Sequence, residues 1–382
     1  MENFTYQNKT KLIFGRNDES VIAAELKNHG AKKVLVHYGQ NSIIKSGLLG
    51  RTKDALNKAG IKYIEFGGVK ANPLRSHALE GITLAKQEKV DFILAIGGGS
   101  VIDSAKCIAV GAVNSKVWDF YTGKKECIKA LPVGVVLTIP AAGSENSRST
   151  VIVDDKSGLK YSFGCEVLRP VFAVINPVIC ATLPKEQVAY GASDILAHLL
   201  ERYFSPDPNI GLTDKILTGA IRQMFIVAPR AYADPTKYES MAEFCLIGTL
   251  AHNGMLALGR VNQDWGTHVI ENKVLSGAHD VAHGAGLAVI FPAWLKHVAK
   301  TKPSKILQFA NEVMDEKTID KGIAKLEAFY KSLGLETTLG GLGIKLDEAR
   351  KFACIAFNKD TVLGEYGQLS FDDILKILEI AK

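Results

Sequence analysis

The feature that most constrains the fold is an alternation of short β-branched runs with amphipathic segments over the first 183 residues. The runs KKVLVHYG, IKYIEFGG, VDFILAIGGG, PVGVVLTIP and VFAVINP have the character of buried strands, and GLLGRTKDALNKAG and SHALEGITLAKQEK separate three of them as helices. Such alternation is typical of βαβ units, which build a parallel sheet with helices on both faces. We therefore predict an α/β fold for this part of the chain.

A different pattern begins after residue 183. The segments SMAEFCLIGTLAHNGMLALG, PSKILQFANEVM, IDKGIAKLEAFYKSLG and SFDDILKILEIAK repeat apolar residues every three or four positions, which is the period of an amphipathic helix. Pro184 suits the start of a helix. The sequence thus predicts two domains, an α/β domain at 1–183 and an all-helical domain at 184–382.

Charge and composition exclude several classes of protein. The 46 basic and 40 acidic residues leave a net charge of +6 without a long Lys/Arg run, which argues against a nucleic-acid-binding protein. No apolar run is long enough to span a membrane, and the N-terminus does not resemble a secretory signal. The six cysteines form no C-x-x-C pair, which favours free thiols in a reducing compartment. We expect a cytoplasmic protein.

A glycine-rich turn follows one of the predicted strands. In VDFILAIGGGSVIDSAK the strand leads into Gly97, Gly98, Gly99 and Ser100, and a helix begins there. Glycines allow the backbone to approach a bulky ligand, and a helix N-terminus offers free N–H groups to a phosphate. The segment predicts a pyrophosphate site, although a tight turn without a ligand would have the same composition.

Two further strand ends carry small polar residues. They contain Gly39, Gln40, Asn41 and Ser42 in one case and Thr138, Gly143 and Ser144 in the other. Ligands of open α/β sheets bind at the carboxyl ends of the strands, so three such ends would suit one extended nucleotide. Each of them taken alone could be an ordinary loop.

A cluster of metal-binding residue types lies in the predicted helical domain. Asp194 and His198 are four residues apart in GASDILAHLLERYF, which places both on one face of a helix. The segment DWGTHVIENKVLSGAHDVAHGAG adds His268, His279 and His283, although the whole chain has nine histidines. One carboxylate with three imidazoles would hold Fe²⁺ or Zn²⁺ with one position open for substrate, and such a metal activates an alcohol or carbonyl for hydride transfer to or from a nicotinamide. The alternative is a pair of hydrogen-bonded core side chains.

Several motifs from both halves, in order, resemble the iron-containing (group III) alcohol dehydrogenase family. They are GGGSVIDSAK, TIPAAGSENS, RPVFAVINP, GASDILAH, LAHNG, DWGTH and AHGAGLAVIFPAW, so the resemblance covers essentially the full chain. It implies a Rossmann-like dinucleotide-binding α/β domain followed by an all-α domain. This is a dehydroquinate synthase-like architecture, and it implies a cofactor and a metal in the cleft between the domains.

The resemblance also implies particular site residues. The metal ligands would be Asp194, His198, His268 and His283. The pyrophosphate would lie on residues 97–100, with Asp103 and Thr138 near the cofactor, and Lys160 in DDKSGLKYSF is similar to a lysine that lies near the cofactor in the aldehyde-reductase branch.

Within the family, the chain resembles the branch of butanol dehydrogenases and NADPH-dependent aldehyde reductases. This implies a reversible enzyme of short-chain aliphatic alcohols and aldehydes, and family precedent favours a homodimer. Relatives that prefer NAD(H) tend to carry an aspartate at the strand end that reads HYGQNS here. Because no acid stands there to repel a 2′-phosphate, NADP(H) is favoured over NAD(H).

The chain departs from the family pattern after His268. Asn272 stands where many relatives carry a histidine near the substrate, and the segment from His268 to His283 is one residue longer than in close relatives. His279 is either a substitute for that histidine or a spare surface residue.

Three other functions are open: an NAD-dependent lyase of the dehydroquinate synthase type, a glycerol dehydrogenase-like oxidation of polyols, and a nucleotide sensor without turnover. The lyase would need several basic side chains, and this segment carries only Lys273.

Overall fold

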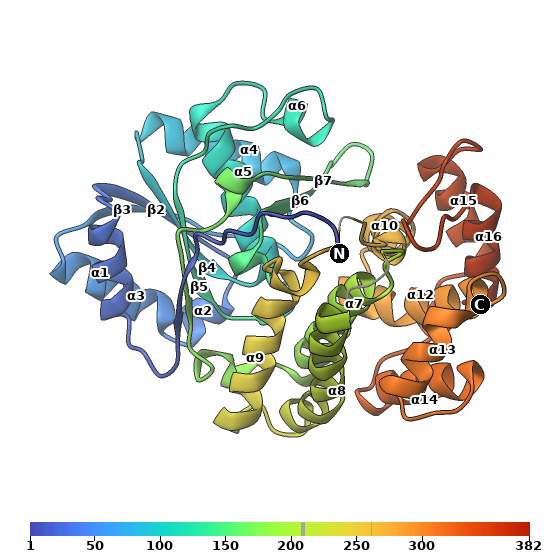
Figure 1. The fold of residues 1–382 in the computed structure, drawn as a ribbon. Helices are drawn as coiled ribbons and strands as arrows, with labels where there is room; N and C mark the ends of the chain where they lie inside the picture. The colour runs from blue at the N-terminus through green and yellow to red at the C-terminus, as the bar shows by residue number, and fades with distance from the viewer. Residues whose placement is uncertain (208–210, 261) are drawn as a thin grey trace. The chain divides into compact units, whose positions relative to one another are not determined.

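The structure is a computed structural model that describes residues 1–207, 211–260 and 262–382. The chain divides into two compact units (Figure 1). We call residues 7–182 the α/β unit, and residues 183–382 together with Met1–Tyr6 the helical unit. The assignment of cofactor binding to the first and of metal and substrate binding to the second stays a prediction.

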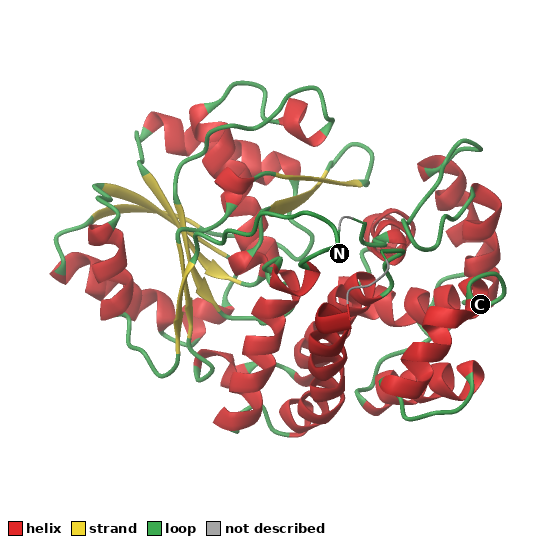
Figure 2. Ribbon diagram, in the orientation of Figure 1, coloured by secondary structure: helices red, strands yellow, loops and turns green. Residues whose placement is uncertain are grey.

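A six-stranded parallel sheet forms the centre of the α/β unit (Figure 2). Its order is β1-β8-β5-β4-β2-β3. The strands are β1 (Lys11–Phe14), β2 (Lys33–Tyr38), β3 (Lys62–Phe66), β4 (Phe92–Gly97), β5 (Val133–Leu137) and β8 (Phe172–Ile175). The central strands β4 and β5 are buried along their whole length, as parallel strands covered on both faces must be.

Helices cover both faces of this sheet (Figure 1). On one face, alternate residues such as Val34 and Leu94 pack against Leu26 and Leu56 of two helices. On the other face, His37 bonds a helix through Ser104. The helices of the unit are α1 (Ser20–Asn28), α2 (Ser42–Lys45), α3 (Leu48–Lys58), α4 (Arg75–Gln87), α5 (Gly99–Val113) and α6 (Trp118–Tyr121), with 3-10 turns η1 (Ser144–Asn146), η2 (Glu166–Leu168) and η3 (Ile179–Thr182). The side chains of α1 and α3 form one core with the sheet, while α4 and α5 cover the opposite face.

The helical unit is built around α7, which contacts α8, α9 and α12. Its helices are α7 (Lys185–Tyr203), α8 (Gly211–Ala233), α9 (Tyr238–His252), α10 (Gly266–Ile270), the π-helix η5 (Glu271–Ser276), α11 (Gly277–His279), α12 (His283–Val298), α13 (Pro303–Glu312), α14 (Ile319–Ser332), α15 (Leu346–Ala356) and α16 (Phe371–Ile380), with the 3-10 turn η4 (Met255–Ala257). From Val188 onward α7 is almost entirely buried, so any polar side chain on it must be satisfied inside the protein.

The predicted fold class is confirmed: a parallel α/β sheet is followed by a largely helical region. The prediction of one helix across SMAEFCLIGTLAHNGMLALG is wrong at its end, because Gly254 adopts a left-handed conformation that stops α9 at His252. Sequence analysis also missed β1, the antiparallel pair β6 (Ser149–Val153) and β7 (Lys160–Gly164), and the π-helix. In the part of the chain that the structure describes, no helix has both the length and the apolar character to cross a membrane.

Candidate active site

Three of the four predicted metal ligands lie around a carboxylate oxygen of the fourth, Asp194, in the helical unit. Helix α7 supplies Asp194 and His198 on the same face, with His198 Nε2 3.4 Å from Asp194 Oδ1. The Nε2 atoms of His268 on α10 and His283 at the start of α12 are 3.9 Å and 3.7 Å from the same oxygen. One ligand atom each of Asp194, His268 and His283 lies within 4.8 Å of the other two. His198 reaches Asp194 without joining that mutual set.

The same cluster contains buried polar atoms that have no hydrogen-bond partner among the described residues. Among the described residues, Asp194 Oδ1 and His268 Nε2 are buried and accept or donate no hydrogen bond. Buried polar atoms are almost always paired, and an unpaired one costs about 1–3 kcal/mol. Unsatisfied oxygen and nitrogen atoms that converge on one point fit a borderline divalent cation such as Fe²⁺ or Zn²⁺.

His268 and His198, the two more deeply buried histidines of the cluster, differ in their electrostatic surroundings. Burial alone would lower the pKa of His268, but the carboxylates of Asp194 and Glu201 outweigh it and raise the pKa to about 9. Burial and the neighbouring His252 and His268 hold the pKa of His198 well below its usual value. The two carboxylates thus favour the charged form of His268, and a cation that binds at Nε2 would have to displace a proton from it.

The sequence analysis assigned no part in the site to three residues that lie behind the ligands. Glu201 bonds His268, Glu271 bonds His283, and His252 Nδ1 lies 2.9 Å from His198 Nδ1. One signal was available: Glu201 follows His198 by three residues, on the same face of an otherwise apolar helix. Trp265 packs edge-on against His198 and His268, with ring centroids 5.7 Å and 5.3 Å away.

Asn272 and His279 lie in the segment that joins the ligands His268 and His283. Asn272 is on the π-helix η5, and His279 is half-buried on α11 with its ring edge-on to Phe352, at a centroid distance of 5.0 Å. Neither lies within the ligand group described above. Their part in proton transfer stays a prediction.

The α/β unit holds the residues predicted to bind the cofactor. Strands β2, β4 and β5 are neighbours in the sheet, so their carboxyl ends lie side by side. Thr138 N donates to Gly97 O at 3.1 Å, which ties two of these ends together. Residues Gln40, Asn41 and Ser42 are exposed beyond the end of β2. The three polar strand ends therefore form one continuous edge.

The glycine turn follows the predicted course from β4 into α5. Gly98 precedes the first helical residue, Gly99, as the N-cap. A Cβ atom on Gly98 would lie 2.8 Å from Ile139 Cβ, whereas one on Gly99 would meet its nearest neighbour, Ala142 Cβ, at 3.8 Å. Gly98 is thus required for packing against the β5 end, whereas a Cβ on Gly99, at the helix N-terminus, would make only ordinary van der Waals contact. That arrangement suits a phosphate group.

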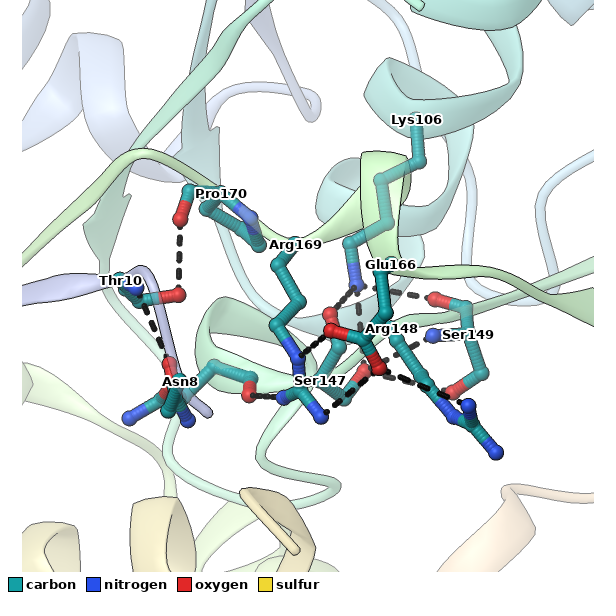
Figure 3. Close-up of polar contacts among 10 residues, drawn as sticks. Asn8, Thr10, Lys106, Ser147, Arg148, Ser149, Glu166, Arg169 and Pro170 are labelled. Carbon is teal, nitrogen blue, oxygen red and sulfur yellow. Dashed lines mark hydrogen bonds and ion pairs between the residues drawn. The ribbon is translucent and has the colours of Figure 1, made fainter. Parts of the chain in front are cut away.

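Asp103 and Lys106, on α5, fasten the loop that follows β5. Asp103 Oδ1 accepts from Ser144 Oγ at 2.6 Å and its Oδ2 accepts from Val151 N at 3.0 Å. Lys106 is fully buried, and its Nζ donates to Ser144 O at 2.7 Å. The same Nζ donates to Ser147 O at 3.1 Å and to Ser149 O at 2.9 Å (Figure 3). Burial lowers the pKa of Lys106 to about 8, against the opposing charges of Asp103 and Glu145. Both side chains therefore hold the loop in place.

Lys160 is the first residue of β7 and is paired with Val153 of β6. Its charge is one of the influences that lower the pKa of Asp103, although burial, the largest influence, raises it overall. Lys160 and Ser144 thus belong to the same polar region around Asp103. Their contacts to a cofactor stay predictions.

Comparison with known proteins assigns both halves of the chain. The family description "iron-containing alcohol dehydrogenase" matches residues 9–177, and "Fe-containing alcohol dehydrogenase family, C-terminal" matches residues 188–382. The probable NADH-dependent butanol dehydrogenase 1 of Bacillus subtilis (strain 168) is 38% identical, with 99% of each chain covered. The NADPH-dependent aldehyde reductase YqhD of Escherichia coli (strain K12) is 34% identical, with 100% of each chain covered.

A solved structure agrees with this assignment. The crystal structure of NADH-dependent butanol dehydrogenase A from Thermotoga maritima superimposes with a TM-score of 0.95 at 38% identity, covering 100% of this chain and 99% of that one. Sequence similarity, fold and the cluster of metal-binding side chains therefore agree. This chain belongs to the iron-containing alcohol dehydrogenase family and is an oxidoreductase of the alcohol dehydrogenase and aldehyde reductase type.

Proposed function

We propose that this enzyme reduces short-chain aliphatic aldehydes, and oxidises the corresponding alcohols, with NADPH and one divalent metal ion. The observation that carries the proposal is the convergence of His268 Nε2 and His283 Nε2 on the unpaired Oδ1 of Asp194. Asp194, His198, His268 and His283 are the proposed ligands, and the metal is Fe²⁺ or Zn²⁺. When bound, the metal supplies Lewis acidity to a carbonyl or alcohol oxygen.

The surrounding protein fixes the positions of the ligands and leaves one side of the cluster accessible. Helix α7 holds Asp194 and His198 in fixed positions because that part of the helix is buried. His283 is the most exposed of the three histidine ligands, with 25% of its side chain accessible. We infer that substrate approaches the cluster on the side of His283. A rigid set of ligands with one accessible side favours a catalytic over a purely structural metal site.

The cofactor is proposed to lie along the edge formed by the ends of β2, β4 and β5. Gly97, Gly98, Gly99 and Ser100 would bind its pyrophosphate, with Asp103, Thr138, Ser144 and Lys160 close by. The uncharged side chains at Gln40, Asn41 and Ser42 favour NADPH over NADH. The relatives are named as users of either cofactor, NADH in Bacillus subtilis and NADPH in Escherichia coli. The bound nicotinamide supplies the hydride.

The reduced oxygen must also receive a proton. Asn272 is an amide that does not titrate, so it cannot replace a histidine as the acid. The proton is proposed to come from solvent, or through His279, whose ring nitrogen Nε2 has no hydrogen-bond partner among the described residues. A His279→Gln variant with an unchanged pH profile for aldehyde reduction would assign this step to solvent.

The substrate range is tested by initial rates on the metal-loaded enzyme. Ethanal, butanal and octanal would be compared for reduction, and butan-1-ol and glycerol for oxidation. We expect the highest kcat/KM for butanal and little oxidation of glycerol. Preferred oxidation of glycerol would instead support a polyol dehydrogenase. A homodimer in the cytoplasm is the expected state of the enzyme, and light scattering after gel filtration tests the dimer.

A further inference from the structure

Two of the proposed metal ligands, His268 and His283, each form a hydrogen bond with their own buried glutamate. His268 Nδ1 lies 3.0 Å from Glu201 Oε1, and His283 Nδ1 bonds Glu271 Oε2. In both histidines the opposite nitrogen, Nε2, is the atom that faces Asp194 Oδ1. Glu201 is 1% exposed and Glu271 is completely buried, so neither carboxylate is there to meet solvent.

Glu201 is engaged by several donors of one segment. Its Oε1 accepts from Thr267 Oγ1 and from His268 N at 3.2 Å, and its Oε2 accepts from Trp265 N at 2.6 Å. Trp265 has a positive φ of 64°, a conformation that costs energy for a bulky residue. The carboxylate thus holds the start of α10 as well as the ring of His268.

Glu271 makes fewer contacts and is placed by the π-helix. Its Oε2 also accepts from Ser276 Oγ at 3.0 Å, across the five-residue spacing of the wide turn. Its Oε1 has no hydrogen-bond partner in the described part of the chain. Gly286 makes room for it, because a Cβ there would collide with the Glu271 carboxylate. A buried carboxylate held in this way has little reason to be present except to bond His283.

A carboxylate bonded to Nδ1 determines what Nε2 can do. The acidic partner accepts the Nδ1–H, so the neutral ring presents a free lone pair on Nε2. It also makes the ring a stronger electron-pair donor and fixes its orientation. Both consequences favour binding of a cation at the point where the Nε2 atoms converge.

We propose that Glu201 and Glu271 are positioning residues that set the Nε2-facing state of His268 and His283 and thereby raise the affinity of the site for its metal. The inference rests on the proposed function, since it presumes that these histidines bind metal. Loss of such a partner in other metal sites lowers affinity about 10–100-fold. The same range is expected here.

Glu271→Gln is the sharper variant, because glutamine keeps the shape and an acceptor oxygen but removes the charge. The dissociation constant of Zn²⁺ would be measured by competition with a chelator on the full-length protein. The absorption bands of bound Co²⁺ would report the geometry of the ligands. We expect the Zn²⁺ dissociation constant to rise about 10–100-fold and the Co²⁺ bands to shift, with the thermal unfolding of the metal-free protein unchanged.

Asp373→Asn is the matched control. Asp373 bonds His297 Nε2 at 3.1 Å, a histidine–carboxylate pair of the same kind in the same unit and outside the ligand cluster. This variant should bind Zn²⁺ as the wild type does. If Glu201→Gln fails to fold, because Glu201 also holds the start of α10, Glu271→Gln still decides the question.

The outcomes separate this inference from the proposed function. Zn²⁺ affinity within twofold of wild type in Glu271→Gln, together with loss of binding in Asp194→Ala, overturns the positioning role alone. Unchanged Zn²⁺ binding in Asp194→Ala itself overturns the metal site and the proposed function with it. Weakened binding in Glu271→Gln but not in Asp373→Asn supports the positioning role.

Discussion

Asp194 determines what its histidine neighbours can bind. A carboxylate oxygen that is buried and unpaired, with three imidazole Nε2 atoms 3.4 Å to 3.9 Å away, is a costly arrangement for a protein that contains no cation. The four-residue spacing of Asp194 and His198 predicted that both would lie on one face of a helix, and they do. The positions of His268 and His283 relative to them depend on the tertiary packing of α10 and α12, which periodicity alone does not reveal.

The choice between NADPH and NADH can be tested at one glycine. A Cβ atom on Gly39 would meet its nearest neighbour, Val101 Cγ2, at 3.6 Å, which is ordinary van der Waals contact, so a side chain is tolerated there. Gly39→Asp should repel the 2′-phosphate and lower the ratio of kcat/KM for NADPH over NADH at least about tenfold, or about 1.4 kcal/mol. The neutral Gly39→Asn variant should change this ratio much less. An unchanged ratio in Gly39→Asp would place the 2′-phosphate elsewhere.

His37 should make β2 sensitive to acid. The ring is fully buried between Phe66 O at 2.8 Å and Ser104 Oγ at 2.9 Å, and burial lowers its pKa to about 3. Because the unfolded chain binds this proton at a pKa of about 6.5, the stabilisation is complete above that pH and is lost as the pH falls towards 3. Between pH 6.5 and 5, we expect the opening free energy of the β2 amides to fall by about 1–2 kcal/mol more than in His37→Gln. Hydrogen exchange of the β2 amides measures the opening free energy in wild type and in His37→Gln. An equal fall in the two proteins would contradict the proposed effect of His37.

At the scale of elements, the strand-and-helix alternation was predictable because each βαβ unit has a local pattern. The five predicted strands are β2, β3, β4, β5 and β8, and all are found. The missed elements lack such a pattern: β1 is an edge strand of four residues, and β6 and β7 form a separate two-stranded sheet. The π-helix η5 was also missed, since its hydrogen bonds are set by the packing of Glu271 and its neighbours rather than by any distinct composition.

The turn between β4 and α5 should distinguish two adjacent glycines. In Gly98→Ala the new methyl group would lie 2.8 Å from Ile139 Cβ, so the turn must move. We expect a loss of about 1–3 kcal/mol in the free energy of unfolding, together with weaker binding of NADPH. In Gly99→Ala the nearest atom is 3.8 Å away, so stability should stay within experimental error of wild type. Thermal unfolding of the two variants, measured side by side, tests this difference in stability. Equal stability of the two variants would contradict the claim that Gly98 is required for packing.

At the scale of the whole molecule, the proposed function assigns the cofactor to the α/β unit and the metal to the helical unit. The sequence predicted that the alternating pattern changes to a helical pattern near residue 183. Along the chain, the boundary between the two compact units falls between residues 182 and 183. Met1–Tyr6 groups with the helical unit, which no local pattern could indicate, because that grouping reflects contacts between distant parts of the chain. Glu271, behind His283, was hidden for the same reason. Glu271 and His283 are twelve residues apart and meet only through the π-helix.

The central claim is that the Asp194 cluster binds a metal ion on which aldehyde reduction depends. The most direct test is the initial rate of NADPH oxidation with butanal, on metal-free protein and on protein reloaded anaerobically with Fe²⁺ or Zn²⁺. Asp194→Ala serves as the variant and Asp373→Asn as the control. We predict no rate without metal, recovery on reloading in wild type and Asp373→Asn, and no recovery in Asp194→Ala. Equal rates in Asp194→Ala and wild type at the same metal content would contradict the account.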